Sequence, residues 1–135
     1  MSGHGSYMDQ LEGKLSGSGL RVAVVAARFN AHITDLMLRR CLETLREHHC
    51  IEDALDAIRV PGAFELPQAV ARLAGTGRYD AVVALGCVIR GATPHFDFVA
   101  GEAARGLGQV AARGEVPVIF GVLTTETEAQ ALERA

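Results

Sequence analysis

The sequence predicts a single α/β domain, a flavodoxin-like three-layer α/β/α sandwich around a central parallel sheet. Along its 135 residues, short apolar runs alternate with longer segments of helical periodicity, and no hairpin signal joins two of the runs. This alternation is typical of right-handed βαβ crossovers, which place helices on both faces of a parallel sheet. A domain of this length buries about two thirds of the surface that its unfolded chain exposes.

The first half of the domain supplies two strands and two helices. Residues 20–27 form a nearly uniform, β-branched apolar run, which indicates a strand buried on both faces. Apolar side chains then recur at helical spacing over 31–49. A short strand follows over 56–60, and residues 64–73 return to helical spacing, with Pro67 in the first turn, where proline is tolerated.

The second half repeats the pattern. Residues 79–85 are the third predicted strand, 94–112 are its alanine-rich helix, and 116–123 are the fourth strand. A last helix is expected over 126–135, with Thr125 as its cap. The strand–helix alternation therefore continues to the end of the sequence.

The domain is expected to cover residues 20–135. Residues 1–19 are rich in glycine and serine and show little periodicity, so we expect them to form a flexible N-terminal arm.

Composition excludes several classes of partner. The net charge of −3 gives no reason to expect binding to nucleic acid or to an anionic membrane. No apolar run approaches the roughly 18 residues of a membrane span, and we expect no signal peptide, since no charged-then-apolar pattern opens the sequence. The three cysteines (Cys41, Cys50 and Cys87) show no C-x-x-C spacing, so we expect reduced thiols and a cytoplasmic location.

The most informative segment spans residues 86–98 and reads GCVIRGATPHFDF. It joins the third predicted strand to its helix, with Thr93 suited to the N-cap and Pro94 to the first helical position. Free N–H groups and the helix dipole make such a turn an anion site. Arg90 adds a fixed charge, and His95 brings a proton-transfer group beside the anion. Together these features indicate a catalytic role.

Other interpretations of the histidines and glycines are weaker. Gly86 and Gly91 have the spacing of a P-loop, but Ala92 stands where the P-loop lysine must be. His95 could be a plain first-turn residue, yet it follows the carboxyl end of a strand, where open α/β sheets bind ligands. The adjacent pair His48-His49 does not indicate a metal site, because neighbouring helical residues point about 100° apart.

Three more strand ends carry unusual side chains. Phe29 follows the first strand and offers a stacking face for a planar ligand, while Asn30 either caps the next helix or serves the site. After the second strand, Gly62 permits close approach of a ligand, and Glu65 either accepts from hydroxyls or merely stabilises a helix N-terminus. Phe120, in the fourth strand segment, is expected to place another ring at the same edge. The sequence has neither a G-x-G-x-x-G motif nor a serine- and threonine-rich phosphate loop after the first strand, so neither a dinucleotide nor tightly bound flavin mononucleotide is expected.

With these segments assembled, the sequence resembles the 6,7-dimethyl-8-ribityllumazine synthase family of riboflavin biosynthesis. The matching segments are RFN at 28–30, VPGAFELP at 60–67, ALGCVIRGATPHFDF at 84–98, PVIFGVLTT at 117–125 and EAQALERA at 128–135. The resemblance implies condensation of 5-amino-6-(D-ribitylamino)uracil with 3,4-dihydroxy-2-butanone 4-phosphate, without a metal or an organic cofactor.

The resemblance also implies roles for individual residues. His95 would be the catalytic proton shuttle. The ribitylaminouracil would be bound by Phe29, Ala63, Phe64, Glu65, Cys87, Val88 and Ile89, and by Phe120 from a neighbouring subunit. The butanone phosphate would be bound by Ala92, Thr93 and Arg134.

Finally, the resemblance implies a homo-oligomer, either a pentamer or an icosahedral shell built from pentamers, with riboflavin synthase as a further partner. A structural shell subunit and a non-catalytic lumazine- or flavin-binding protein are the alternative functions, although His95 and Arg134 together favour an enzyme. Family chains continue beyond the equivalent of residues 134–135 with a further helix, which residues 20–135 are expected to lack.

Overall fold

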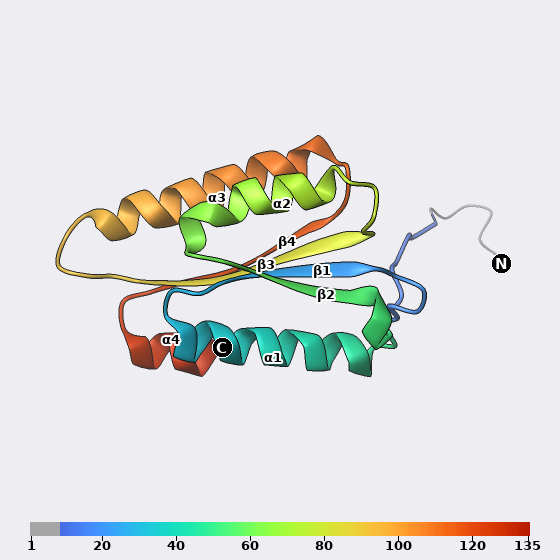
Figure 1. The fold of residues 1–135 in the computed structure, drawn as a ribbon, viewed down its shortest axis with the longest axis horizontal. Coiled ribbons are helices and arrows are strands. Elements are labelled where there is room, and N and C mark those ends of the chain that lie inside the picture. The colour runs from blue at the N-terminus through green and yellow to red at the C-terminus, as the bar shows by residue number, and fades with distance from the viewer. Residues whose placement is uncertain (1–8) are drawn as a thin grey trace.

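The computed structural model describes residues 9–135, which form a parallel sheet of four strands in the order β2-β1-β3-β4. The strands are β1 (Val22–Ala27), β2 (Leu55–Val60), β3 (Ala81–Ile89) and β4 (Val118–Thr125). The α-helices are α1 (Ala31–Glu47), α2 (Leu66–Ala74), α3 (His95–Arg113) and α4 (Glu128–Arg134), and short 3-10 turns span Glu52–Ala54 and Ala63–Glu65. Figure 1 shows α2 and α3 on one face of the sheet and α1 and α4 on the other. The predicted three-layer sandwich is confirmed.

The central strands are buried on both faces, as their apolar runs predict. In β1, Ala23 and Val25 point into the core beneath α2 and α3, whereas Val22 and Val24 point into the core beside α1 and α4. All six residues of β1 are buried. Because successive side chains of a strand alternate between faces, such a strand needs apolar residues at every position.

The third strand is longer than predicted. It was expected to end at residue 85, but it continues to Ile89, because Cys87, Val88 and Ile89 lie in register with Leu123, Thr124 and Thr125 of β4. Gly86 therefore lies within the strand, where a Cβ atom would approach Leu66 Cδ1 to 3.2 Å. The turn before α3 is correspondingly reduced to residues 90–94.

Two predicted helix caps are wrong. Pro94, not Thr93, is the N-cap of α3, so the helix begins one residue later than expected. The cap of α4 is Thr127, which accepts from the Gln130 N–H at 3.1 Å in a capping box, while Thr125 instead donates to the Thr127 carbonyl. Each cap lies in the turn after β3 or β4, and both strands end later in the chain than the sequence predicts.

The segment before β1 has neither helix nor strand over residues 9–21. Part of the expected arm, residues 1–8, lies outside the described residues. Gly17 is buried, and its N–H donates to the His48 carbonyl at 2.6 Å. This end of the predicted arm is therefore packed against the loop after α1.

A glycine in α3 permits close packing of two helices. A Cβ atom on Gly106 would lie 2.6 Å from Cβ and Cγ of Pro67 in α2, whereas nothing lies within 4 Å of one on Gly108. We expect Gly106→Ala to destabilise the protein by about 1–3 kcal/mol through overpacking. Gly108→Ala should instead stabilise it by about 0.5–1 kcal/mol. Thermal or denaturant unfolding of the two variants measures the difference, and equal effects would contradict the close helix contact.

Candidate functional site

A pocket of about 700 Å³ opens at the carboxyl ends of the strands. These strand ends lie toward the left of Figure 1. It is lined by Phe29, Pro61, Gly62, Ala63, Phe64, Glu65, Cys87, Val88, Ile89, Gly91, Thr93, His95, Phe96, Phe98 and Val99. Parallel strands bring their carboxyl ends to one edge of the sheet, which is where open α/β folds bind ligands. The structure thus joins three predicted segments that are far apart in the sequence.

The backbone of Phe29 fixes the position of its exposed ring. The ring is 72% exposed, while its N–H donates to the Pro61 carbonyl at 3.0 Å. Asn30 is the N-cap residue of α1 and has a left-handed backbone (φ 61°), but its side chain makes no cap hydrogen bond. Its Nδ2 instead donates to the Cys87 carbonyl at 2.9 Å, which connects the turn that carries Phe29 to the end of β3.

The last residues of β3 offer backbone groups to the pocket. Pairing with β1 ends at Leu85, whereas pairing with β4 continues to Ile89. The Cys87 carbonyl points to the β1 side, where Asn30 binds it. Backbone groups alternate along a strand, so the N–H and carbonyl of Ile89 point to the same side. These groups can bind the polar edge of a planar ligand.

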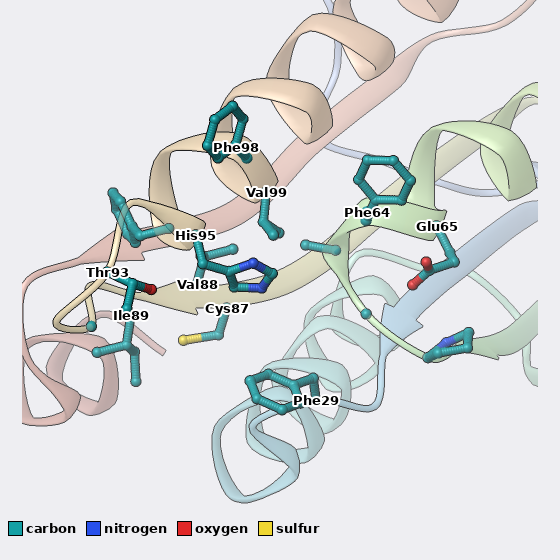
Figure 2. A pocket seen from close by; sticks show the side chains of 15 residues that line it. Phe29, Phe64, Glu65, Cys87, Val88, Ile89, Thr93, His95, Phe98 and Val99 are labelled. Carbon is teal, nitrogen blue, oxygen red and sulfur yellow. The ribbon is translucent and has the colours of Figure 1, made fainter.

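Glu65 lies opposite His95 in the pocket. The Glu65 side chain extends beside Gly62, where a Cβ atom would lie 3.3 Å from Glu65 Oε1. Gly62 therefore leaves room for the carboxylate and for a ligand next to the backbone. In Figure 2, Glu65 and Phe64 border one side of the pocket, and Thr93 and Ile89 border the other.

His95 is the first residue of α3, and its imidazole points into the space between Phe29 and Glu65 (Figure 2). Within residues 9–135, no side chain caps the N-terminus of α3. The first N–H groups of a helix attract anions, so a phosphate bound here would lie beside the imidazole. Thr93 lines the same part of the pocket.

Arg90 does not supply the free charge that the sequence predicts. Its guanidinium lies 3.1 Å from Glu126 and 3.6 Å from Asp97, and stacks 4.4 Å from the centre of the Phe96 ring. Two carboxylates offset its charge, and the residue lies outside the pocket. Arg90 instead connects the first turn of α3 to the segment after β4.

Cys87 is unsuited to nucleophilic chemistry. Its side chain is buried in the core beside α1 and α4, and its carbonyl accepts from Asn30. Burial raises the pKa of the Cys87 thiol, and the Glu128 carboxylate raises that pKa further. A thiol in such surroundings stays protonated near neutral pH.

The family model for 6,7-dimethyl-8-ribityllumazine synthase matches residues 19–135. The chain belongs to this family. The match covers all four strands and all four α-helices of the described sheet and its two helical layers. Membership in the lumazine synthase family supports a transferase-type enzyme of riboflavin biosynthesis.

Three site residues predicted from the resemblance to lumazine synthases lie outside the pocket: Ala92, Phe120 and Arg134. Phe120 is the third residue of β4, in register with Ala84, so its ring does not reach the carboxyl edge as expected. It is half exposed on the outer strand of the sheet. Arg134 ends α4 on the opposite face of the sheet, where its Nη1 donates to the Gln130 carbonyl at 3.1 Å. Neither residue contributes to the site of its own chain.

Other lining residues were not predicted from the sequence: Pro61, Gly91, Phe96, Phe98 and Val99. Phe98 is the most notable, because its ring is 70% exposed on the first turn of α3. It follows His95 by three positions, which places the two side chains on neighbouring parts of one helix face. That spacing was the available signal in the sequence.

The remaining sequence features form no metal site in the described residues. Over residues 9–135, no group of three or more His, Cys, Asp or Glu side chains is placed to hold a metal ion. His48 Nδ1 instead donates to the Thr44 carbonyl at 2.9 Å, at the end of α1. In the described part of the chain, no helix combines the length and the apolar character needed to cross a membrane.

Proposed function

We propose that this protein condenses 5-amino-6-(D-ribitylamino)uracil with 3,4-dihydroxy-2-butanone 4-phosphate to form 6,7-dimethyl-8-ribityllumazine, the penultimate step of riboflavin biosynthesis. The observation that carries this proposal is one pocket that joins the exposed Phe29 ring, the Glu65 carboxylate and the His95 imidazole at the N-terminus of α3. A planar, hydroxyl-rich substrate and a phosphate ester need these three kinds of group.

The ribitylaminouracil occupies the Phe29–Glu65 half of the pocket. Its ring stacks on Phe29, and its polar edge meets the backbone of Cys87, Val88 and Ile89. The ribityl hydroxyls donate to the Glu65 carboxylate and lie along the backbone of Ala63 and Phe64. Stacking and hydrogen bonding act on the planar substrate in both ground and transition states, so these contacts mainly supply binding.

The butanone phosphate occupies the half next to α3. Its phosphate binds the free N–H groups at the start of the helix, beside Ala92 and Thr93. The amine of the first substrate attacks the ketone, and loss of water gives an imine. Inorganic phosphate then leaves, and ring closure releases a second water. His95 moves protons between the amine, the departing oxygens and water. A reaction with a good leaving group needs mainly this positioning and one proton shuttle.

We further propose that the site is completed by a neighbouring copy of the chain in a cytoplasmic homo-oligomer. Phe120 and Arg134 both lie outside the pocket of their own chain. A second subunit would place Phe120 over the ring of the ribitylaminouracil and Arg134 beside the phosphate of the butanone phosphate. It would thereby enclose the open pocket. Light scattering distinguishes a pentamer from an icosahedral shell, and a monomer at working concentration would contradict this arrangement.

The decisive test is a time course of 6,7-dimethyl-8-ribityllumazine absorbance with both substrates present. We expect product and inorganic phosphate to appear in equal amounts, with neither formed when one substrate is omitted. Absence of product at every enzyme concentration would contradict the proposed reaction. Equimolar phosphate release is the second readout, because it separates condensation from simple binding of a pre-existing lumazine.

A further inference from the structure

Arg59 in β2 reaches across to the carboxyl end of β1. It lies in register with Ala26, and its side chain is only 21% exposed. Its Nε donates to the Ala26 carbonyl at 3.1 Å, and Nη2 donates to the Ala27 carbonyl at 3.0 Å. These are the last two residues of β1 before the turn that carries Phe29. A partly buried guanidinium is thus bonded to main-chain carbonyls just before the turn that carries Phe29.

The same guanidinium also holds the start of the next helix. Nη1 donates to Asp35 Oδ1 at 2.8 Å, and Nη2 lies 3.4 Å from Thr34 Oγ1, both in the first two turns of α1. One planar group therefore binds the chain before and after residues 28–30. A guanidinium presents its donors in a rigid fork, so these acceptors are held at fixed relative positions.

The turn itself is bonded to the residues that follow Arg59. The Arg28 N–H donates to the Val60 carbonyl at 2.7 Å, and the Phe29 N–H donates to the Pro61 carbonyl at 3.0 Å. Since the Phe29 ring is largely exposed, the position of the ring depends on these backbone bonds and on the strand end that Arg59 binds. Movement of Arg59 would displace the stacking surface.

We propose that Arg59 is a positioning residue for the half of the site that binds the planar substrate. The Arg59 guanidinium fixes the end of β1 and the start of α1. It thereby sets the position and orientation of the Phe29 ring relative to the end of β3. The identity of that substrate rests on the proposed function, whereas the mechanical coupling between Arg59 and the turn does not. Lysine cannot replace arginine here, because one ammonium group cannot bind carbonyls and a carboxylate at these separate positions.

The first measurement is independent of activity. Hydrogen–deuterium exchange at the Arg28 and Phe29 amides should accelerate about tenfold or more in Arg59→Lys and Arg59→Gln. Arg46→Gln is the matched control, because it removes an exposed pair with Glu52 (2.6 and 2.9 Å) from the same side of the sheet. Exchange at residues 28–29 should be unchanged in that variant. Asp35→Ala, which loses the Asp35 contact that joins Arg59 to α1 but keeps the contacts to β1, should accelerate exchange by a smaller factor.

The second measurement separates the two substrates. Arg59→Lys and Arg59→Gln should raise the KM for ribitylaminouracil about tenfold, with kcat and the KM for butanone phosphate changed less than about threefold. Unchanged exchange and KM in both Arg59 variants, or full rescue by lysine, would overturn the inference. A uniform rise in exchange across the sheet would also overturn it, since that result indicates general destabilisation. If the wild-type protein forms no lumazine, the proposed function fails, while the exchange experiment still decides the coupling.

Discussion

Replacing His95 with alanine should lower kcat by about 10- to 1000-fold while the fold and the assembly stay intact. The side chain is exposed in the pocket and is not part of either apolar core, so its removal costs little stability. General acid–base groups typically contribute about 10²- to 10⁴-fold, and water can carry protons in a condensation of this kind, which places the expected loss at the lower end. Steady-state kinetics with both substrates saturating measures the effect.

His48→Ala provides the matched control for His95. It removes another exposed imidazole, at the end of α1, and should change kcat less than about twofold. Thermal unfolding should place both variants close to the wild type. If His95→Ala keeps full activity, the residue is only a first-turn helix residue, and the proton shuttle must lie elsewhere in the site.

The layered fold could be predicted because the relevant signal is local. β1 consists only of valine and alanine, and a strand covered on both faces requires that composition. The end of β3 could not be predicted in the same way. Residues 86–89 contain a glycine after an apolar run, which locally resembles a turn, and their strand conformation depends on pairing with β4 more than thirty residues later.

Much of the candidate site could also be predicted, because each residue follows a strand and parallel strands bring their carboxyl ends together. The sequence alone could not show what neutralises Arg90. Its partners Asp97 and Glu126 come from the first turn of α3 and from the segment after β4, and only the folded chain brings them together. That Phe120 and Arg134 lie outside the pocket of their own chain could not be predicted for a related reason, since their positions depend on depth in a strand and on the sheet face that a helix covers.

Replacing Phe29 or Glu65 should raise the KM for ribitylaminouracil and leave the KM for butanone phosphate nearly unchanged. Stacking of a base on an aromatic ring is worth about 1–3 kcal/mol, so Phe29→Ala should raise the first KM by about tenfold or more. A hydrogen bond to a charged group is worth about 1.5–3 kcal/mol, which predicts a similar or larger rise for Glu65→Ala, because alanine removes the acceptor. Initial rates measured against each substrate in turn give both constants from one preparation, so each variant is its own control for folding.

The conservative variant Phe29→Tyr refines this test. It keeps an aromatic face on a side chain that is 72% exposed and has room for a hydroxyl, so the KM should return to within about threefold of the wild-type value. Phe29→Leu keeps the apolar volume without the flat ring and should remain impaired. Because these contacts persist in the transition state, kcat should change little in any of the variants. An equal or larger effect on butanone phosphate would mean that the two substrates occupy the opposite halves of the pocket, with the phosphate beside Glu65. A carboxylate there would repel the phosphate, which is the physical reason to expect the arrangement proposed for this site.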